Sequence, residues 1–252
     1  MLLSGAEVAT RDRFDKARIE AQARTPWGRA LSALPVRWFH AKLEGAERIP
    51  REGAALLVGN HAFAGIDGMV LGTLVLRETG RVVRFLGERH LWDVPGFRTL
   101  ITALGAVPGE PEAAVKLLQG GDLVAVYPGG VDDSFKPSTE KYRLQWKDRA
   151  GFARVAMRAR VPILPVAGLG IDEMYTVVGK EKWVGRAVMG SPRYDMPIAF
   201  GAFGTLIPRR APQAYVVLPP VDTSGDAASP ADVERVRKAT FEAIEGVLAT
   251  AR

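Results

Sequence analysis

The chain has 252 residues, of which 47% are apolar and 25% are charged, with a formal net charge of +6. This composition excludes a disordered chain and fits one folded domain with an N-terminal extension. The absence of cysteine excludes disulfides, thiolate metal ligands and a cysteine nucleophile. With only three histidines, His40, His61 and His90, we expect no metal site. The basic surface should attract anionic partners.

Residues 1–42 are predicted to form amphipathic helices that dock on a membrane surface. Residues 7–24 have the pattern of a polar helix, and Pro26 begins a second segment. That segment carries four large apolar residues at helical spacing on one face: Trp27, Leu31, Leu34 and Trp38. Tryptophans beside basic residues are typical of a headgroup interface. The alternative is that this stripe packs on the main domain. Pro35 is expected to break the segment into two short helices.

Residues 43–252 are predicted to form one enzyme-sized domain in which strands and helices alternate. Short apolar runs typical of buried strands occur at residues 54–59, 81–86, 123–127, 161–166 and 215–218. Helical patterns lie between most of them, at residues 69–77, 97–104, 111–119 and 151–158, and a final helix covers 230–251. This alternation predicts an α/β fold with a mostly parallel central sheet flanked by helices. No stretch reaches about 18 apolar residues, so any membrane contact should be peripheral.

Two strand ends carry residues with catalytic potential. The run ending at Gly59 continues into His61 and, six residues later, Asp67. A carboxylate that accepts the proton of one ring nitrogen holds the other as a base toward a hydroxyl group. Taken alone, this pair also fits a structural contact or a helix cap. The run ending at Tyr127 continues into a glycine-containing turn, residues 128–131, which also fits an ordinary tight turn.

Several motifs in order resemble the lysophospholipid acyltransferase superfamily, whose usual first motif is Asn-His, four residues, then Asp. Here five residues separate Asn60-His61 from Asp67. With Tyr127-Pro128-Gly129-Gly130-Val131 and the run 161–166, this spacing resembles the diacylglycerol acyltransferase type 2-like branch, which includes phytyl ester synthases. The resemblance covers roughly residues 43–222 and implies a glycerol-phosphate acyltransferase-like fold.

The resemblance also implies a mechanism. His61 would take the proton of an acceptor hydroxyl, Asp67 would orient His61, and the alkoxide would attack the thioester of acyl-CoA or acyl carrier protein. Such a transfer needs no cofactor beyond this co-substrate. Further expected substrate contacts are Asn60, Gly65, Pro128, Gly129, Gly130 and Val131. Backbone N–H groups of the turn are expected to stabilise the oxyanion.

The acceptor is indicated by a missing arginine. Members that use a phosphorylated acceptor have a Glu-Gly-Thr-Arg motif, where this chain has Gly129-Gly130-Val131-Asp132. This difference favours a neutral acceptor such as mono- or diacylglycerol. A lysophospholipid stays open, because Lys136, Arg143 or Arg89 could bind phosphate from elsewhere in the fold. The segment 91–104, with Trp92, is a candidate wall of an acyl-chain groove.

Rival functions fit the sequence less well. Gly168-Leu169-Gly170 lacks the third glycine of a dinucleotide fingerprint, and there is no Gly-x-Ser-x-Gly elbow. No nucleic-acid recognition module is found, so nucleic acid is not an expected partner. The remaining alternative is a catalytically weak, lipid-binding or membrane-scaffolding relative. We expect a cytoplasmic protein at the inner face of the membrane, and the sequence does not determine its oligomeric state.

Overall fold

The computed structural model describes residues 21, 25–93, 98, 101–102, 105–181 and 196–252. Its centre is a seven-stranded sheet in the order β1-β9-β6-β2-β5-β3-β4. The strands are β1 (Lys42–Glu44), β2 (Ala55–Gly59), β3 (Val83–Gly87), β4 (Val107–Pro108), β5 (Leu123–Val126), β6 (Ile163–Leu169) and β9 (Ala214–Val217). β6, β2, β5, β3 and β4 are mutually parallel, while β9 is antiparallel to β6. The predicted α/β fold with a mostly parallel sheet is confirmed.

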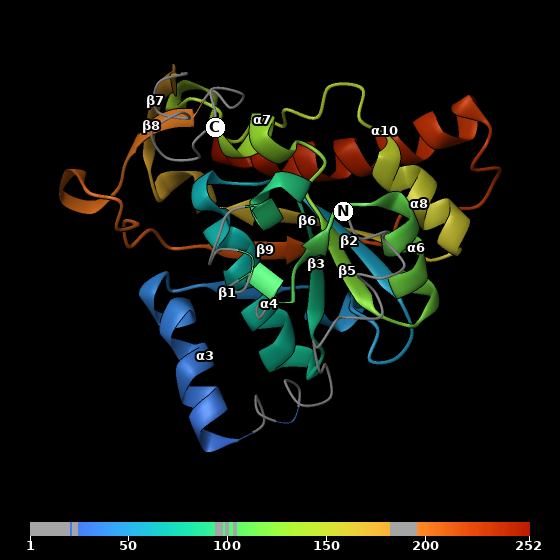
Figure 1. The fold of residues 1–252 in the computed structure, drawn as a ribbon, viewed down its shortest axis with the longest axis horizontal. Helices are drawn as coiled ribbons and strands as arrows, with labels where there is room; N and C mark the ends of the chain where they lie inside the picture. The colour runs from blue at the N-terminus through green and yellow to red at the C-terminus, as the bar shows by residue number, and fades with distance from the viewer. Residues whose placement is uncertain (1–20, 22–24, 94–97, 99–100, 103–104, 182–195) are drawn as a thin grey trace.

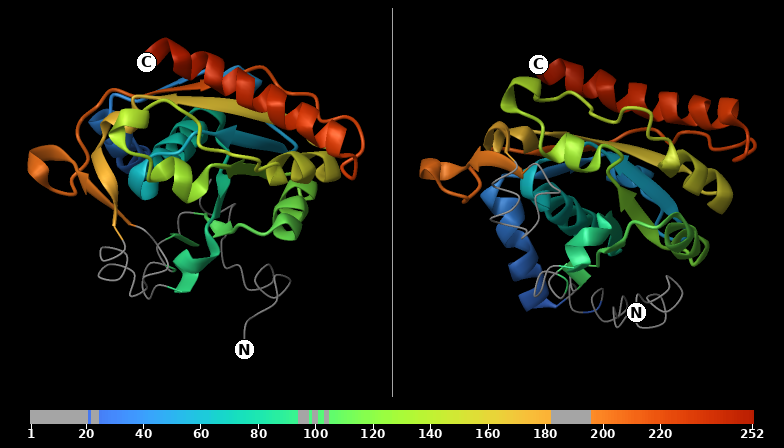
Figure 2. Two further views of the ribbon diagram at one scale, coloured as in Figure 1. Left: turned by 90° about the horizontal axis from the view of Figure 1, so that it is seen from above. Right: turned by 45° about the horizontal axis from the view of Figure 1, so that its top comes forward.

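Helices cover both faces of this sheet (Figures 1 and 2). On β2, Ala55 and Leu57 pack in a core with α4 (Ile66–Thr79), near α3 (Pro26–Trp38). Leu56 and Val58 point to the other face and pack in a second core. That core includes residues of α6 (Pro111–Gln119), α8 (Gly151–Ala159) and α10 (Pro230–Leu248). A strand covered on both faces has no polar side to expose, which explains the uninterrupted apolar run at 54–59.

The predicted elements differ from the structure mainly at their ends. The helix expected at residues 69–77 extends over Ile66–Thr79 and therefore includes Asp67. The helix expected at 97–104 lies mostly outside the described residues. Between β6 and β9 the sequence pattern missed a two-stranded antiparallel sheet of β7 (Thr176–Glu181) and β8 (Met196–Phe200).

The prediction that Pro35 divides the N-terminal segment into two short helices is wrong. α3 is one helix from Pro26 to Trp38, with the Thr25 hydroxyl accepting the Gly28 N–H at its start. Pro35 lies in the last turn, where the loss of a single N–H donor does not prevent the helix from ending normally at Trp38.

The apolar stripe on α3 is not packed into the domain core. Trp27, Leu34 and Trp38 are exposed, whereas Val36 packs against the core on the α4 side. No helix among the described residues is long and apolar enough to span a bilayer.

Candidate active site

The candidate site forms where two neighbouring parallel strands end. Val58 of β2 pairs with Val126 of β5, so the residues that follow these strands emerge side by side at the same edge. His61 follows β2 and Tyr127 follows β5. Their rings are stacked, with centroids 4.3 Å apart and an interplanar angle of 6°. The sheet topology thus brings together two strand ends that are far apart in the sequence.

His61 is joined to Asp67 by a hydrogen bond of 2.9 Å between Nδ1 and Oδ2. The connecting segment reverses through two left-handed residues, Ala64 and Gly65, before α4 begins at Ile66. This tight reversal takes up the five-residue spacing and places Asp67 in the first turn of the helix, facing back to the ring. The side chain of Asp67 is only 1% exposed, while that of His61 is 19% exposed.

The surroundings of His61 favour its protonated form. Burial alone would lower the pKa of the imidazole, but the charge and hydrogen bond of Asp67, together with the charge of Asp133, raise it above the usual 6.5. With Nδ1 donating to Asp67, the neutral ring carries its lone pair on Nε2. His61 lines the cavity beside the site, so this nitrogen is the atom available to a substrate proton.

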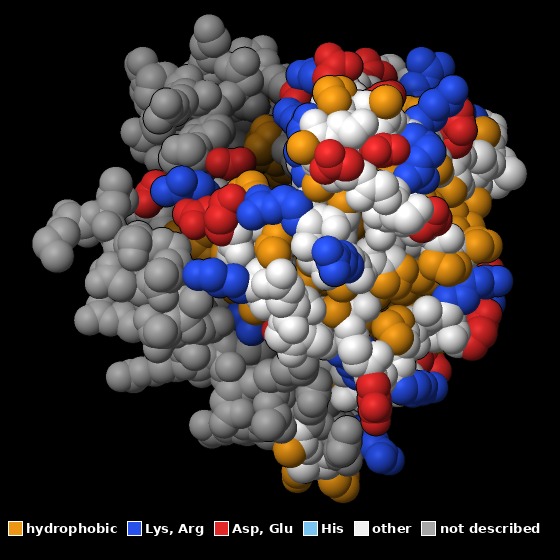
Figure 3. Space-filling model, turned by 90° about the vertical axis from the view of Figure 1, so that its right-hand side faces the viewer, with side chains coloured by type: hydrophobic (Ala, Val, Ile, Leu, Met, Phe, Trp, Pro, Cys, Tyr) orange, Lys and Arg blue, Asp and Glu red, His pale blue; other side chains and the backbone are white. Residues whose placement is uncertain are grey.

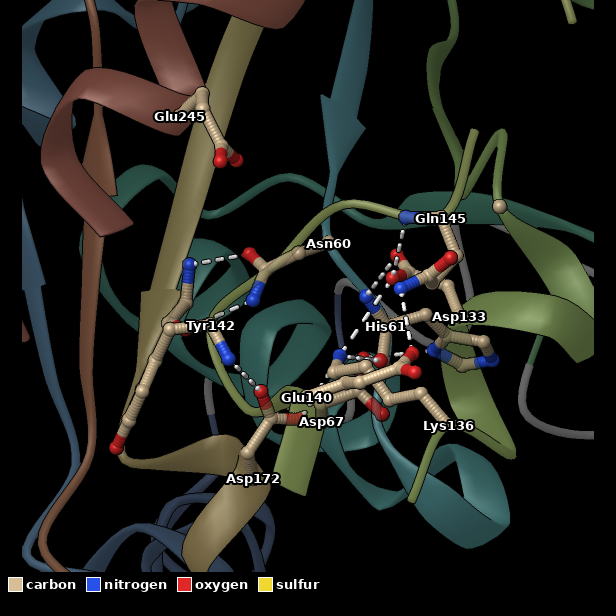
Figure 4. Close-up of polar contacts among 12 residues, drawn as sticks. Asn60, His61, Asp67, Asp133, Lys136, Glu140, Tyr142, Gln145, Asp172 and Glu245 are labelled. Atoms are coloured by element: carbon tan, nitrogen blue, oxygen red, sulfur yellow. Dashed lines mark hydrogen bonds and ion pairs between the residues drawn. The ribbon is translucent and has the colours of Figure 1, made fainter. Parts of the chain in front are cut away.

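The backbone of His61 is held by a second buried carboxylate and its counter-ion (Figure 4). Oδ2 of Asp133 accepts the N–H of His61 at 3.1 Å, and Nζ of Lys136 donates to the His61 carbonyl at 3.3 Å. Asp133 and Lys136 lie 3.5 Å apart and are both buried. Both backbone polar groups of His61 are therefore bonded to one ion pair, which restricts the direction of its side chain.

Lys136 forms ion pairs with two buried carboxylates inside the protein. Its Nζ lies 3.0 Å from Oδ1 of Asp172, whose Oδ2 accepts the N–H of Tyr142. Burial lowers the pKa of Lys136, but the two carboxylates more than offset this and raise it above its usual value. Its charge is thus neutralised by Asp133 and Asp172. Lys136, one of the three residues that could bind phosphate, does not line the cavity beside His61.

The glycine turn after β5 packs against Asp133. A Cβ atom on Gly129 would lie 2.3 Å from the Cβ of Asp133, so only glycine fits there. Gly130 has φ +49°, a left-handed conformation that glycine adopts without strain, and its N–H donates to the Tyr127 carbonyl. Pro128 and Gly129 are buried, and Arg149 donates to both of their carbonyl groups. This turn therefore leaves the space that the Asp133 side chain occupies.

Asn60 joins β2 to β6. Its Nδ2 donates to the Gly168 carbonyl at 2.9 Å, and its Oδ1 accepts the Gly168 N–H at 2.7 Å. Both polar atoms of this buried side-chain amide are hydrogen-bonded to the backbone of β6. The position expected for substrate contact is therefore one that fixes the strand end immediately before His61.

An apolar cavity of about 310 Å³ opens beside His61 and Tyr127. It lies between α4 and β3, and its lining includes Gly65, Gly68, Met69, Gly72, Leu76, Val83, Phe85 and Leu86. Gly65, one of the predicted substrate contacts, is among these lining residues. Val131 and Arg143 do not line it, and Arg143 is exposed. Arg89 forms a 3.6 Å ion pair with Glu110. Most of the candidate wall at 91–104 lies outside the described residues, although Ile101 lines the cavity.

Two residues of the site were missed in the sequence. Tyr127 supplies the stacking ring, and both its burial and the Asp67 charge raise its pKa well above the usual 10, so the phenol stays neutral. Asp133 binds the His61 backbone. The only sequence signal for Asp133 was an acidic residue three positions before Lys136, a spacing that is common on protein surfaces.

We expect each carboxylate near His61 to contribute separately to the pKa of its ring. Asp67→Asn should lower the pKa most, because it removes both a charge and a charged hydrogen bond, and Asp133→Asn should lower it by a smaller amount. The matched control is Asp132→Asn, since Asp132 pairs with Lys147 and Arg149 instead. NMR titration of the His61 ring protons measures all three. An Asp133→Asn ring that titrates like the Asp132→Asn ring would contradict the assignment.

Comparison with known proteins identifies the family of the chain. A family profile described as acyltransferase matches residues 40–168, about half of the chain, and this span includes His61, Asp67, Tyr127 and Asp133. A crystal structure of the 1-acyl-sn-glycerophosphate acyltransferase PlsC from Thermotoga maritima superposes with a TM-score of 0.55. It covers 98% of this chain and 94% of that one at 19% identity, which shows a shared fold.

Curated relatives are similar over a large part of the chain. The bovine protein named DGAT1/2-independent enzyme synthesizing storage lipids is 33% identical over 166 residues, 66% of this chain and 49% of that protein. An uncharacterized protein of Mycobacterium tuberculosis is 32% identical over 218 residues, 84% of this chain and 60% of that protein. The chain spans about half to three-fifths of the length of these relatives. The predicted superfamily is confirmed, and the finer branch stays a prediction: the chain belongs to the acyltransferase family.

Proposed function

We propose that this chain is an O-acyltransferase that moves a fatty acyl group from acyl-CoA, or from acyl carrier protein, to a lipid hydroxyl group. The observation that supports this most is the His61–Asp67 pair at the mouth of an apolar cavity. Within the described part of the chain, the His61 ring is hydrogen-bonded to Asp67 and to no serine or threonine hydroxyl. Such a base suits a reaction in which the substrate supplies the nucleophile. The family match fits the same class of reaction.

In the proposed mechanism, Nε2 of His61 takes the proton of the acceptor hydroxyl while Asp67 stabilises the resulting imidazolium. The alkoxide oxygen forms a bond to the thioester carbonyl carbon, giving a tetrahedral oxyanion. Collapse of this intermediate breaks the carbon–sulfur bond, and the thiolate receives the proton from His61. The products are an ester and a free thiol, and His61 is neutral again.

The oxyanion needs hydrogen-bond donors that are fixed before the reaction begins. Within the turn 128–131, Pro128 has no N–H and the N–H of Gly130 donates to Tyr127. We therefore propose the N–H groups of Gly129 and Val131 as the donors.

We propose a neutral glycerolipid as the acceptor, as in the diacylglycerol acyltransferase type 2-like branch. No lysine or arginine is found among the described residues that line the cavity, and Lys136 is neutralised by two carboxylates. A phosphorylated headgroup beside His61 would therefore meet no lysine or arginine among the described lining residues. The name of the bovine relative refers to storage lipids, which supports the same class of acceptor.

The cavity between α4 and β3 suits the acyl chain. Gly68 and Gly72 lie one helical turn apart on α4 and face Phe85 and Tyr127, so the helix side of the cavity has no side chains at these positions. We further propose that residues 43–252 form the catalytic domain. Residues 1–42 would dock it peripherally on the cytoplasmic face of a membrane.

The first experiment measures thiol release from palmitoyl-CoA with diacylglycerol, monoacylglycerol or lysophosphatidic acid in separate reactions. Release should depend on a neutral acceptor and fall by about 10²- to 10⁴-fold in His61→Ala, the usual contribution of a general base. The control is His40→Asn, which removes an exposed histidine outside the cavity. Vesicle binding without acceptor-dependent release would favour the lipid-binding scaffold, and a preference for lysophosphatidic acid would overturn the acceptor class.

The rate of transfer should rise with pH, because only neutral His61 accepts a proton. Since the pKa of His61 is raised, the midpoint of this rise is expected above 6.5 in the wild type. Asp67→Asn removes the main cause of the raised pKa, so its midpoint should move to lower pH while its maximal rate falls. The pH profile of kcat/KM with a fixed acceptor tests this. A midpoint that moves to higher pH in Asp67→Asn would contradict the assignment of His61 as the base.

Gly72→Leu should shorten the acyl chain that the enzyme accepts. A Cβ atom at Gly72 would already lie 2.9 Å from the ring of Phe85, so a leucine side chain would fill part of the cavity. The ratio of rates with octanoyl-CoA and palmitoyl-CoA should move toward octanoyl-CoA. Gly246→Leu is the matched control, because Gly246 is a helix glycine of α10 with open space around it. An equal loss with both donors would show that the cavity does not hold the acyl chain.

A further inference from the structure

Exposed apolar side chains are concentrated at one end of the molecule. Nine large apolar side chains are well exposed among the described residues, and seven of them come from α3 or from residues 200–207. These seven are Trp27, Leu34, Trp38, Phe200, Phe203, Leu206 and Ile207. In both Figures 1 and 2, α3 and the loop after β8 lie on the left-hand side of every view. Such a concentration marks an interaction surface.

The loop at 201–207 is built to present its apolar side chains. Phe203 is 99% exposed, Leu206 72% and Ile207 53%. The N–H of Gly201 donates to the Thr205 carbonyl at 2.6 Å, and the N–H of Ala202 donates to the Ile207 carbonyl at 2.7 Å. These bonds close the loop on itself and fix its shape.

The loop is also attached firmly to the domain. The Tyr175 hydroxyl donates to the Leu206 carbonyl at 2.9 Å, and the N–H of Arg209 donates to the Met174 carbonyl at 3.0 Å. Phe203 has φ +54°, a left-handed conformation that costs a non-glycine residue energy. A fully exposed phenylalanine ring on a fixed loop is unfavourable in water. We therefore expect the Phe203 side chain to be buried against a binding partner outside the chain.

The loop is continuous with the end of α3. The guanidinium of Arg210 lies 5.3 Å from the centre of the Trp38 ring, and the N–H of Gln213 donates to the Phe39 carbonyl at 3.0 Å. The apolar side chains of both segments therefore border one surface, which we call the docking face: α3 together with residues 200–210.

The charge of the docking face is of one sign. Residues 25–43 and 196–213 contain no aspartate or glutamate but carry Arg29, Arg37, Lys42, Arg209 and Arg210. By contrast, the opposite end of the molecule carries interspersed acidic and basic side chains (Figure 3). Apolar side chains with only basic residues around them match a bilayer surface that contains anionic phospholipids.

We propose that residues 201–207 form a second membrane-inserting element, which acts with α3 to hold the protein on an anionic bilayer. Phe203, Leu206 and Ile207 would enter the boundary between headgroups and acyl chains, and Arg210 and Arg37 would contact lipid phosphates. Docking would then involve residues 201–207 in addition to the N-terminal segment. Vesicle binding can be measured without turnover, so this inference is tested separately from the proposed catalysis.

The test is co-sedimentation of the purified full chain with vesicles of phosphatidylcholine, alone or mixed with phosphatidylglycerol. The wild type should bind the mixed vesicles more tightly. The double variant Phe203→Ser/Leu206→Ser should bind them at least about tenfold more weakly, since it removes two large apolar side chains from the interface. Both positions are exposed, so circular dichroism should show an unchanged fold.

A charge variant separates the two parts of the interaction. Arg210→Glu should abolish the preference for phosphatidylglycerol, whereas Lys238→Glu, at an exposed position on α10, should leave it unchanged. Unchanged vesicle binding by the double serine variant would overturn the proposal. The same holds if light scattering shows that this variant converts a dimer into a monomer while vesicle binding is retained, because the face would then join two copies of the chain.

Discussion

The contact between the Asp67 carboxylate and the His61 imidazole constrains the rest of the site. Asp67 is almost completely buried, and of its two oxygens only Oδ2 has a hydrogen-bond partner among the described residues. A buried carboxylate is costly unless it is paired, so the position of the ring is specified by electrostatics as well as by packing. The left-handed reversal at Ala64 and Gly65 and the start of α4 at Ile66 are what bring the two groups within 2.9 Å.

A second group of buried charges supports this contact from behind. Asp133 and Lys136 bind the N–H and the carbonyl of His61, and Lys136 is in turn paired with Asp172. Gly129 is small because Asp133 lies against it. The glycine turn, the short helix α7 (Gly130–Ser134) and the loop to Asp172 can therefore be understood as parts of one arrangement that fixes a single histidine. One face of the His61 ring stacks on Tyr127.

Helix α4 connects the site to the docking face. It carries Asp67 in its first turn, lines the apolar cavity with Gly68 and Gly72, and packs against α3. In the proposed function, a lipid acceptor and an acyl chain must reach His61 from a bilayer. Because α4 both lines the cavity and packs against α3, the proposed docking face and the proposed site share one helix.

The sequence by itself determined the fold class and indicated the candidate pair of His61 and Asp67. Doubly covered strands give uninterrupted apolar runs such as 54–59, and this local pattern predicts the parallel sheet without knowledge of strand order. His61 and Asp67 could be identified because both belong to one short motif after one strand. Tertiary structure decided the rest. Tyr127 stacks on His61 from 66 positions away, and Asp133 binds the His61 backbone from 72 positions away. Arg210 lies over the Trp38 ring, 172 positions away. No local pattern encodes such contacts. The same is true of Lys136, which the sequence offered as a candidate phosphate ligand. In the structure it is buried as the counter-ion of two carboxylates, because the fold places Asp133 and Asp172 beside it.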